Sequence, residues 1–342
     1  VSRMSLTPKQ IPEGAIRYNT DSNKMEVWNG QKWMIVSVSS PNLDGGSRGV
    51  FFGQNPSPEA NVIQFITIES QGNATDFGDL TDLKNQGASC ASNTRGIYGG
   101  GENPSVTNVI EFVTISSTGN ATDFGDMTDQ RRRMGDMSCS NQTRGLFFGG
   151  YDGSSGGTLN LIDFITIATT GNAVDYGDLE NKREAGASFA SPTRGLNMGG
   201  RVQPANTKMN NIEFVTIAST GNAQDFGDLG TARIAAVGAS NPIRGVIMAG
   251  STMPADITDI SFMTIATKGN STKFGDLTNI TDYPIGAVAS PTRAVAGGGS
   301  YPGMTDDMEY IHFATEGNSV FFGNLLSAQG DGAGCSNGHG GL

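Results

Sequence analysis

The feature that most constrains this chain is a unit near fifty residues that recurs six times. An arginine followed by glycine or alanine marks each copy, and a Gly-Asn pair follows 25 to 28 residues later. Successive arginines are 47 to 50 residues apart: Arg48, Arg95, Arg144, Arg194, Arg244 and Arg293. Self-similarity at this period is typical of propellers and solenoids, in which each copy packs on its neighbours.

Each copy divides into four short runs that are typical of β-strands. In the second copy they are GASCAS (87–92), RGIYGGG (95–101), VIEFVTI (109–115) and ATDFGDM (121–127). Four strands per repeat correspond to one propeller blade. The third run is apolar at both alternating sets of positions, as expected for a sheet that is covered on both faces. No stretch has the period of an amphipathic helix, so we expect an all-β protein.

The two ends of the repeat region complement each other. The first copy begins at Arg48 with the second strand-like run and lacks the first one. GAGCSN (332–337) matches GASCAS but has no Arg-Gly run after it. We therefore predict that GAGCSN pairs with GVFFG (49–53), which closes a ring and removes exposed sheet edges. The sequence thus predicts a six-bladed β-propeller of four-stranded blades over residues 47–342.

Residues 1–46 lie outside the repeat, and we assign them to a separate module and linker. GAIRYNTDSNKMEVWNGQKWMIV (14–36) contains two strand-like runs around Asn29-Gly30, a strong signal for a type I′ hairpin. Trp28 and Trp33, the two tryptophans of the chain, flank that turn. We expect a small β-hairpin module here, and a hairpin that only caps the propeller is the alternative.

Composition argues against several function classes. The net charge of -11 leaves no surplus of Lys and Arg for a basic face, so we expect no nucleic-acid partner. No stretch resembles a membrane span, and the first residues lack the apolar core of a signal peptide, so neither membrane insertion nor classical secretion is expected. Cys90, Cys139 and Cys335 have no metal or disulfide spacing and are expected to be small packing residues of a protein assembled in a reducing cytoplasm.

The motif GNATDFGD, at 72–79 and 119–126, could be a glycan acceptor, a cation loop or a turn. The sequon threonine is not repeated in every copy, and Lys273 and Phe321 replace the first aspartate in two copies. Only the Gly-Asn pair persists in all six. We therefore interpret it as a two-residue turn between the third and fourth strands, where glycine supplies a positive φ, and we expect no metal site.

Groups suited to catalysis are scarce. His312 lies in a strand-like run and His339 in a glycine-rich tail. The acidic column repeats from copy to copy, whereas an active site needs a singular constellation: Glu111, Asp163, Glu213 and Glu309. We therefore expect no enzyme and no cofactor. The arginine column is expected to be structural, each arginine tying a turn to a nearby carbonyl or carboxylate.

Recognition on a rigid scaffold usually resides in its variable loops. The turns SPTR (191–194 and 290–293) and STGN (117–120 and 219–222) are uniform, whereas the connections on the opposite face vary in length. That variable face is the expected binding surface, and seven residues in or beside its loops are candidates: Arg131, Arg132, Arg133, Tyr151, Arg201, Lys208 and Tyr301. For each of them, and for the run 131–133 as a whole, a solvated surface position is the alternative.

Several motifs carry a family resemblance. FFGG (147–150), GGG (99–101) and MGG (198–200) end the second strand as the di-glycine of kelch repeats does. TRGLFFGG, IEFVTIASTGN and DFGDL together resemble the kelch-like propellers of tailed-phage virion proteins, especially phages of cyanobacteria, and the FGD motif is more particular than the general kelch pattern. The N-terminal pattern of Tyr-Asn-Thr, Trp-Asn-Gly and Trp resembles a small β module of phage tail-fibre proteins.

This resemblance implies a non-enzymatic virion structural protein, either a tail fibre, a tail-associated protein or a capsid-decorating protein, assembled in the host cytoplasm. The module that contains Trp28 and Trp33 would attach it to other virion proteins. The propeller would contact host-surface glycan or protein, and the protein would be a homo-oligomer in the particle. A glycan-binding receptor lectin is the alternative, and a polysaccharide depolymerase is the third possibility.

Overall fold

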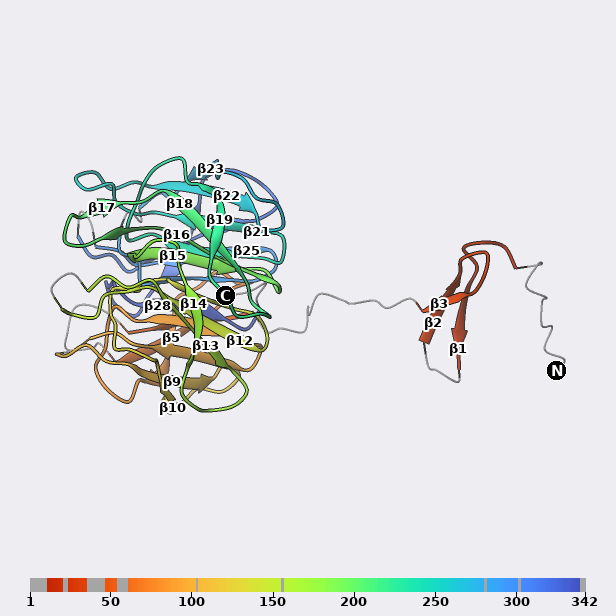
Figure 1. Cartoon of the computed structure of the whole chain (residues 1–342), viewed down its shortest axis with the longest axis horizontal. Helices are drawn as coiled ribbons and strands as arrows, with labels where there is room; N and C mark the ends of the chain where they lie inside the picture. Colours follow the sequence, from red (N-terminus) through yellow and green to blue (C-terminus); the bar gives the residue numbers. More distant parts are fainter. Residues whose placement is uncertain are drawn as a thin grey trace. The chain divides into compact units, whose positions relative to one another are not determined.

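The computed structural model is all-β, as the sequence predicts (Figure 1). It describes residues 11–20, 24–35, 47–53, 61–102, 104–154, 157–279, 282–300 and 303–338, and none of these lies in a helix. Their strands form seven antiparallel sheets of three to five strands. The chain divides into two compact units, Val1–Leu43 and Asp44–Leu342.

The first unit is a three-stranded sheet of β1 (Ile16–Asn19), β2 (Lys24–Trp28) and β3 (Trp33–Ile35), in that spatial order. It has one strand more than expected. The side-chain oxygen of Asn29 accepts hydrogen bonds from the backbone N–H groups of Gln31 and Lys32, at 3.1 and 2.9 Å. Of the Asn29-Gly30 pair only Gly30 has a positive φ, 88°. The type I′ prediction is therefore wrong, because that turn needs two left-handed residues.

The second unit contains six sheets, five of which come from consecutive segments of the chain. In each of these the spatial order follows the chain, with β17 (Thr207–Lys208) added beside β16 in one of them. The strands of these five sheets are β7 (Ala88–Ala91), β8 (Arg95–Gly99), β9 (Val109–Thr114), β10 (Thr122–Asp126); β11 (Ser138–Ser140), β12 (Arg144–Phe148), β13 (Leu161–Thr166), β14 (Val174–Asp178); β15 (Glu184–Ala190), β16 (Arg194–Val202), β18 (Asn211–Thr216), β19 (Gln224–Asp228); β20 (Val237–Ser240), β21 (Arg244–Met248), β22 (Asp259–Thr264), β23 (Thr272–Asp276); β24 (Gly286–Ala289), β25 (Arg293–Gly297), β26 (Asp307–His312) and β27 (Val320–Asn324).

The remaining sheet joins the two ends of the repeat region. Its spatial order is β28 (Ala333–Ser336), β4 (Arg48–Phe52), β5 (Val62–Thr67) and β6 (Thr75–Asp79). β28 runs antiparallel to β4, with Cys335 opposite Val50. The C-terminal strand thus supplies the first strand that the first repeat lacks.

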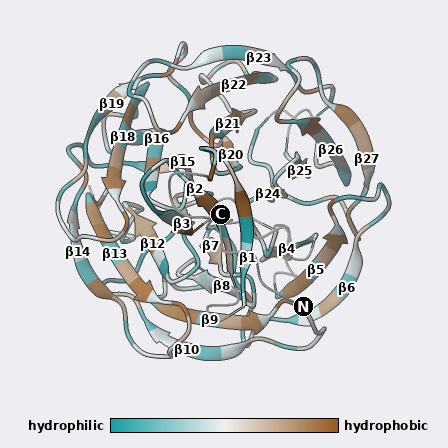
Figure 2. Ribbon diagram, turned by 90° about the vertical axis from the view of Figure 1, so that its right-hand side faces the viewer, coloured by the Kyte–Doolittle hydropathy of each residue, from teal (hydrophilic) through white to brown (hydrophobic). Residues whose placement is uncertain are grey.

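The first strands of the six sheets contact one another in a cyclic order, β28, β7, β11, β15, β20, β24 and back to β28. Figure 2 shows the fourth strands β6, β10, β14, β19, β23 and β27 at the periphery of this unit. The segments that precede the first strands therefore lie at its centre, where the candidate site is found.

The FGD motif of the fourth strand forms a bulge. In β10 the register shifts between Asp123 and Gly125, and the buried ring of Phe124 packs edge-on against Phe112, with ring centres 6.0 Å apart. Gly125 has a φ of 146°, and a Cβ there would lie 2.5 Å from the backbone of Gly171 in the next repeat. Only glycine allows this approach between repeats.

The Gly-Asn pair connects neighbouring repeats. β9 and β10 are separated by residues 115–121, so the prediction of a two-residue hairpin is wrong. The Gly119 N–H donates to the Phe77 carbonyl at 2.7 Å, and the side-chain oxygen of Asn120 accepts from the Asp79 N–H at 3.1 Å. The loop is longer than expected because it reaches the FGD motif of the preceding repeat. The Gly-Asn pair and that FGD motif therefore form one contact between neighbouring repeats.

Each arginine of the column binds a carbonyl of the next repeat. Arg48 Nη1 donates to the Ile115 carbonyl at 2.8 Å while its guanidinium lies 4.3 Å from the centre of the Phe65 ring. Arg293, in the last repeat, donates to the Ile68 carbonyl of the first at 3.2 Å. The same donation is made by Arg95, Arg144, Arg194 and Arg244. These contacts supply the partner that the sequence left open.

Candidate functional site

Arg131 is a buried structural residue. Its side chain is fully inaccessible, pairs with the carboxylate of Asp163 and donates from Nη1 to the Gly149 carbonyl at 3.1 Å. Burial lowers the pKa of the guanidinium and the Asp163 charge opposes this shift, so the arginine stays charged. The expectation that Arg131 belongs to a solvent-facing binding loop is therefore wrong.

Two other members of the acidic column form buried pairs of the same kind, Lys84–Glu111 and Arg183–Glu213. Arg233 pairs instead with the half-buried Asp259, two residues before the column position, and Glu309 accepts the backbone N–H groups of Thr278 and Asn279. Lys84, Arg183 and Arg233 each lie 11 residues before the arginine of the column, whereas Arg131 lies 13 before Arg144. This difference of two residues hides the basic column in the sequence, and it also displaces Arg133 toward the centre of the unit.

Six backbone hydrogen bonds form a cycle through residues at or just before the start of the first strands. Their N–H donors and carbonyl acceptors, 2.7 to 3.3 Å apart, are Gln86 to Asp331, Met134 to Gln86, Ala185 to Arg133, Ala235 to Ala185, Tyr283 to Ala235 and Asp331 to Tyr283. Each repeat places one non-glycine residue with a positive φ, between 43° and 60°, in or beside this cycle: Gln86, Arg133, Ala185, Ala235, Tyr283 and Asp331. Left-handed backbone at such residues is strained and is enriched at functional sites.

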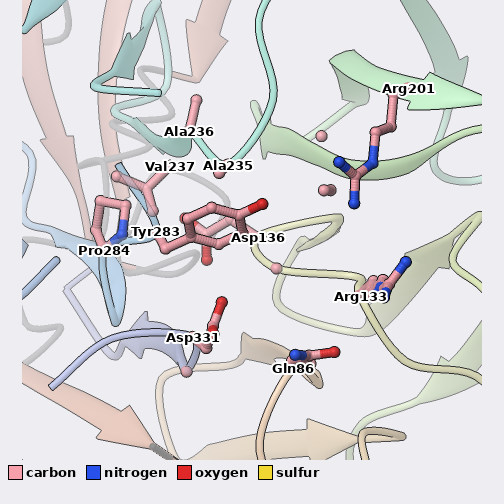
Figure 3. Close-up of a pocket in the computed structure, with 14 residues that line it drawn as sticks. Gln86, Arg133, Asp136, Arg201, Ala235, Ala236, Val237, Tyr283, Pro284 and Asp331 are labelled. Atoms are coloured by element: carbon pink, nitrogen blue, oxygen red, sulfur yellow. The ribbon is translucent and has the colours of Figure 1, made fainter. Parts of the chain in front are cut away.

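This cycle surrounds a cavity of about 210 Å³ (Figure 3). The cavity has polar and apolar parts. Its apolar lining includes Ala235, Ala236, Val237 and Pro284. Its polar side chains are those of Gln86, Arg133, Asp136, Arg201, Tyr283 and Asp331. Two of the seven candidates named from the sequence, Arg133 and Arg201, are thus brought to one pocket.

Arg133 and Arg201 share one buried carboxylate. The Oε1 atom of Glu184 accepts from Arg201 Nε at 2.8 Å and from Arg133 Nη1 at 3.3 Å. The Glu184 side chain is buried, whereas that of Arg133 is 32% exposed. Two guanidinium groups facing one carboxylate leave this wall of the pocket with one positive charge in excess. It is suited to bind an anionic group.

The opposite wall carries Tyr283 and Asp331, and Figure 3 shows them across the pocket from the two arginines. Burial raises the pKa of Tyr283, so its hydroxyl keeps its proton at neutral pH. Among the described residues, Gln86 Oε1 is buried without a hydrogen-bond partner. This acceptor is available to a ligand.

Asp136 is buried at the pocket's edge and accepts backbone N–H groups from three sheets. Gly238 donates to its Oδ2 at 3.0 Å, and Ala287 and Gly334 also donate. Burial raises the pKa of Asp136 to about 8, against the effect of these hydrogen bonds. The equivalent positions of the other repeats carry no charge: Gly87, Gly186, Ala236, Ile285 and Gly332. Asp136 is thus the one carboxyl that this set of positions holds.

The chain was compared with protein-family models and with curated proteins. No protein-family model matches the chain, and no curated protein matches it. The pocket and the exposed surfaces of the two units are therefore the observations from which a function is inferred.

The remaining predicted loop residues lie beside the pocket or away from it. Arg132 and Arg133 lie over the ring of Tyr151, 5.4 and 5.2 Å from its centre, and Arg132 pairs with Glu102. Lys208 donates to the Met253 carbonyl at 3.1 Å. Tyr301 and His339 lie outside the described residues.

The described ranges hold no assembled metal site, and their cysteines are buried. These ranges hold no cluster of three or more His, Cys, Asp or Glu that could bind a metal ion. Cys90, Cys139 and Cys335 are free and buried, and burial raises their pKa values, so they are packing residues as the sequence predicts. His312 lies exposed on β26 beside Tyr310. Within the same ranges, no helix has the length and apolarity to span a membrane.

The sheet of the first unit has two unlike faces. On one face Trp28 is buried and lies 5.5 Å from Trp33, whose ring the Arg17 guanidinium covers. Strand pairing places four apolar side chains on the other face, and they are 42% to 64% exposed: Ile16, Tyr18, Met25 and Met34. Trp28 is therefore a core residue of the module, and the opposite face carries these four exposed apolar side chains.

Proposed function

We propose that residues 47–342 form a closed six-bladed kelch-like β-propeller in which each sheet of the second unit is one blade. The pairing of β28 with β4 and the cyclic contacts of the first strands support closure. The cycle of six backbone hydrogen bonds around the central cavity supports it further. Such a scaffold holds loops rigidly and supplies no chemistry of its own.

We further propose that the protein is a non-enzymatic structural protein of a phage virion. It is a tail fibre, a tail-associated protein or a capsid-decorating protein, present as a homo-oligomer and assembled in the host cytoplasm. The first unit attaches it to other virion proteins, and the propeller is displayed for contact with the host surface. The observation that carries the attachment role is the exposed apolar face of the N-terminal sheet, because contiguous apolar patches mark protein–protein interfaces.

The attachment role is tested with a full-length chain that carries Ile16→Ser and Met34→Ser. We expect particles to incorporate this variant poorly, while the thermal unfolding of the propeller stays unchanged. Ile243→Ser is the matched control, since Ile243 is equally apolar and 69% exposed but lies in the second unit. Undiminished incorporation of the double variant would show that this face is not the attachment surface.

The central pocket favours glycan recognition as a second candidate function. It combines hydrogen-bonding side chains with one aromatic ring and a small apolar lining, which is the usual make-up of a specific small-ligand site. A glycan array probed with the full-length protein tests it. Binding to a defined group of glycans supports this function, and the absence of binding to every glycan opposes it.

A further inference from the structure

We infer that the central pocket binds one sugar unit that carries a carboxylate, such as the terminal uronic acid of a glycan. The inference rests on the glycan-recognition role proposed for the propeller and names its ligand. It is independent of the attachment role of the first unit. Four features of the pocket carry it: its size, its cationic wall, its polar wall and its apolar lining.

The size of the pocket fits one ring. A cavity of about 210 Å³ is smaller than the roughly 300–1,000 Å³ of pockets that take drug-sized ligands, so it suits a ligand about as large as one sugar ring. A glycan would therefore enter by its terminal unit.

The cationic wall selects a carboxylate. Glu184 Oε1 already accepts from both arginines, and the positive charge left in excess has no second carboxylate on that wall. Arg133 is partly exposed and keeps further N–H donors for a ligand. A planar carboxylate matches the fork of a guanidinium group, so this wall distinguishes an acidic sugar from a neutral one.

The polar wall selects hydroxyl groups on the same ligand. Gln86 Oε1 is a buried acceptor without a partner among the described residues, so it can accept from a ring hydroxyl. The ring of Tyr283, together with Val237 and Pro284, offers an apolar surface to the C–H face of a sugar.

The experiment measures binding of small ligands to the full-length protein by saturation-transfer NMR and isothermal titration calorimetry. Its ligands are D-glucuronate, D-galacturonate, D-glucose, L-glutamate and inorganic phosphate. We expect a uronate to bind at least about tenfold more tightly than glucose, since a charge-assisted hydrogen bond distinguishes them, and phosphate and glutamate to bind weakly.

Two variants test whether the ligand binds in the central pocket. Arg133→Gln and Gln86→Leu should each weaken uronate binding about tenfold. Arg132→Gln is the matched control, because Arg132 is the chain neighbour of Arg133 but pairs with Glu102 outside the pocket lining. Thermal unfolding of each variant checks that it is folded. If a variant does not fold, the comparison of the five ligands on the unaltered protein still tests the inference.

The inference would be overturned if glucose bound as tightly as either uronate, or if glutamate or phosphate bound more tightly than both uronates. It would also be overturned if no uronate bound at tens of millimolar, or if both pocket variants left uronate binding unchanged. The attachment role is tested separately. If no uronate binds but particles still incorporate the Ile16→Ser, Met34→Ser variant poorly, only the ligand inference is wrong.

Discussion

The periphery and the centre of the repeated unit use equivalent positions in opposite ways. Away from the centre the same side chains make the same contact in every repeat, as the arginine column and the Gly-Asn pair do. At the centre, equivalent left-handed positions hold Gln86, Arg133, Ala185, Ala235, Tyr283 and Asp331. Side chains that must hold neighbouring repeats together are therefore uniform, whereas side chains around the cavity are free to differ and to form a singular site.

The largest effect should come from breaking one of the repeated buried ion pairs. Arg183→Leu leaves Glu213 buried without its cation, so we expect a loss of about 3–5 kcal/mol in the free energy of unfolding. Urea unfolding measures it. Lys208→Ala is the control, because the half-buried Lys208 makes one hydrogen bond, to the Met253 carbonyl, so its loss should cost less than about 1 kcal/mol. A loss as small as that of the control would refute a structural role for the pair.

The next effect depends on pH and tests the centre. The unfolded Asp136 carboxyl ionises near its ordinary pKa, whereas in the folded protein its pKa is about 8. Between these values the folded state keeps a proton that the unfolded state loses, so raising the pH from 6 to 8 should remove about 2 kcal/mol of stability. Asp136→Asn should flatten this pH dependence in denaturant unfolding. Equal slopes for both proteins would contradict the burial of a protonated carboxyl.

A glycine at the periphery comes third. Gly125→Ala places a Cβ 2.5 Å from the backbone of Gly171 and fixes alanine at a φ of 146°. We expect a loss of about 1–3 kcal/mol, measured as a lowered melting temperature. Gly230→Ala is the matched control, since no atom lies within 4 Å of its Cβ position. If both substitutions shift the melting temperature alike, the close approach of repeats is not needed.

The smallest expected loss of stability compares one contact between repeats with one side chain at the centre. Asn172→Ala removes one hydrogen bond, from the Asp126 N–H to the Asn172 side chain at 3.1 Å, so we expect a loss of about 1 kcal/mol. Arg133→Gln, at the centre, should change stability by less than that, because its side chain is partly exposed. Chemical denaturation of both variants ranks them. The reverse ranking would mean that the central side chains serve the fold.

The sequence predicted the repeated part of the molecule better than its singular part. The period, the four strands per repeat and the partner strand of β4 follow from patterns that recur and can be aligned. The longer loop before β10 was missed, because a Gly-Asn pair is also the signature of a short hairpin and its true partner lies in another repeat. Arg131 was placed on the surface because its buried partner Asp163 is 32 residues away.

The pocket could be predicted only in part. Arg133 and Arg201 are unusual charged residues in variable segments, so they were recognised as candidates. Tyr283, Asp331 and Asp136 come from different repeats, and only the three-dimensional arrangement brings them together. A sequence without a structure gives no signal for such a convergence, since each residue is ordinary within its own repeat.

Amide hydrogen exchange of β28 tests the central claim, that the repeats form one closed ring, most directly. The account predicts that the β28 amides, residues 333–336, exchange as slowly as those of β11, residues 138–140, which is the first strand of a sheet built from one continuous segment. Exchange of β28 at the rate of an exposed loop, with β11 still protected, would contradict closure through β4.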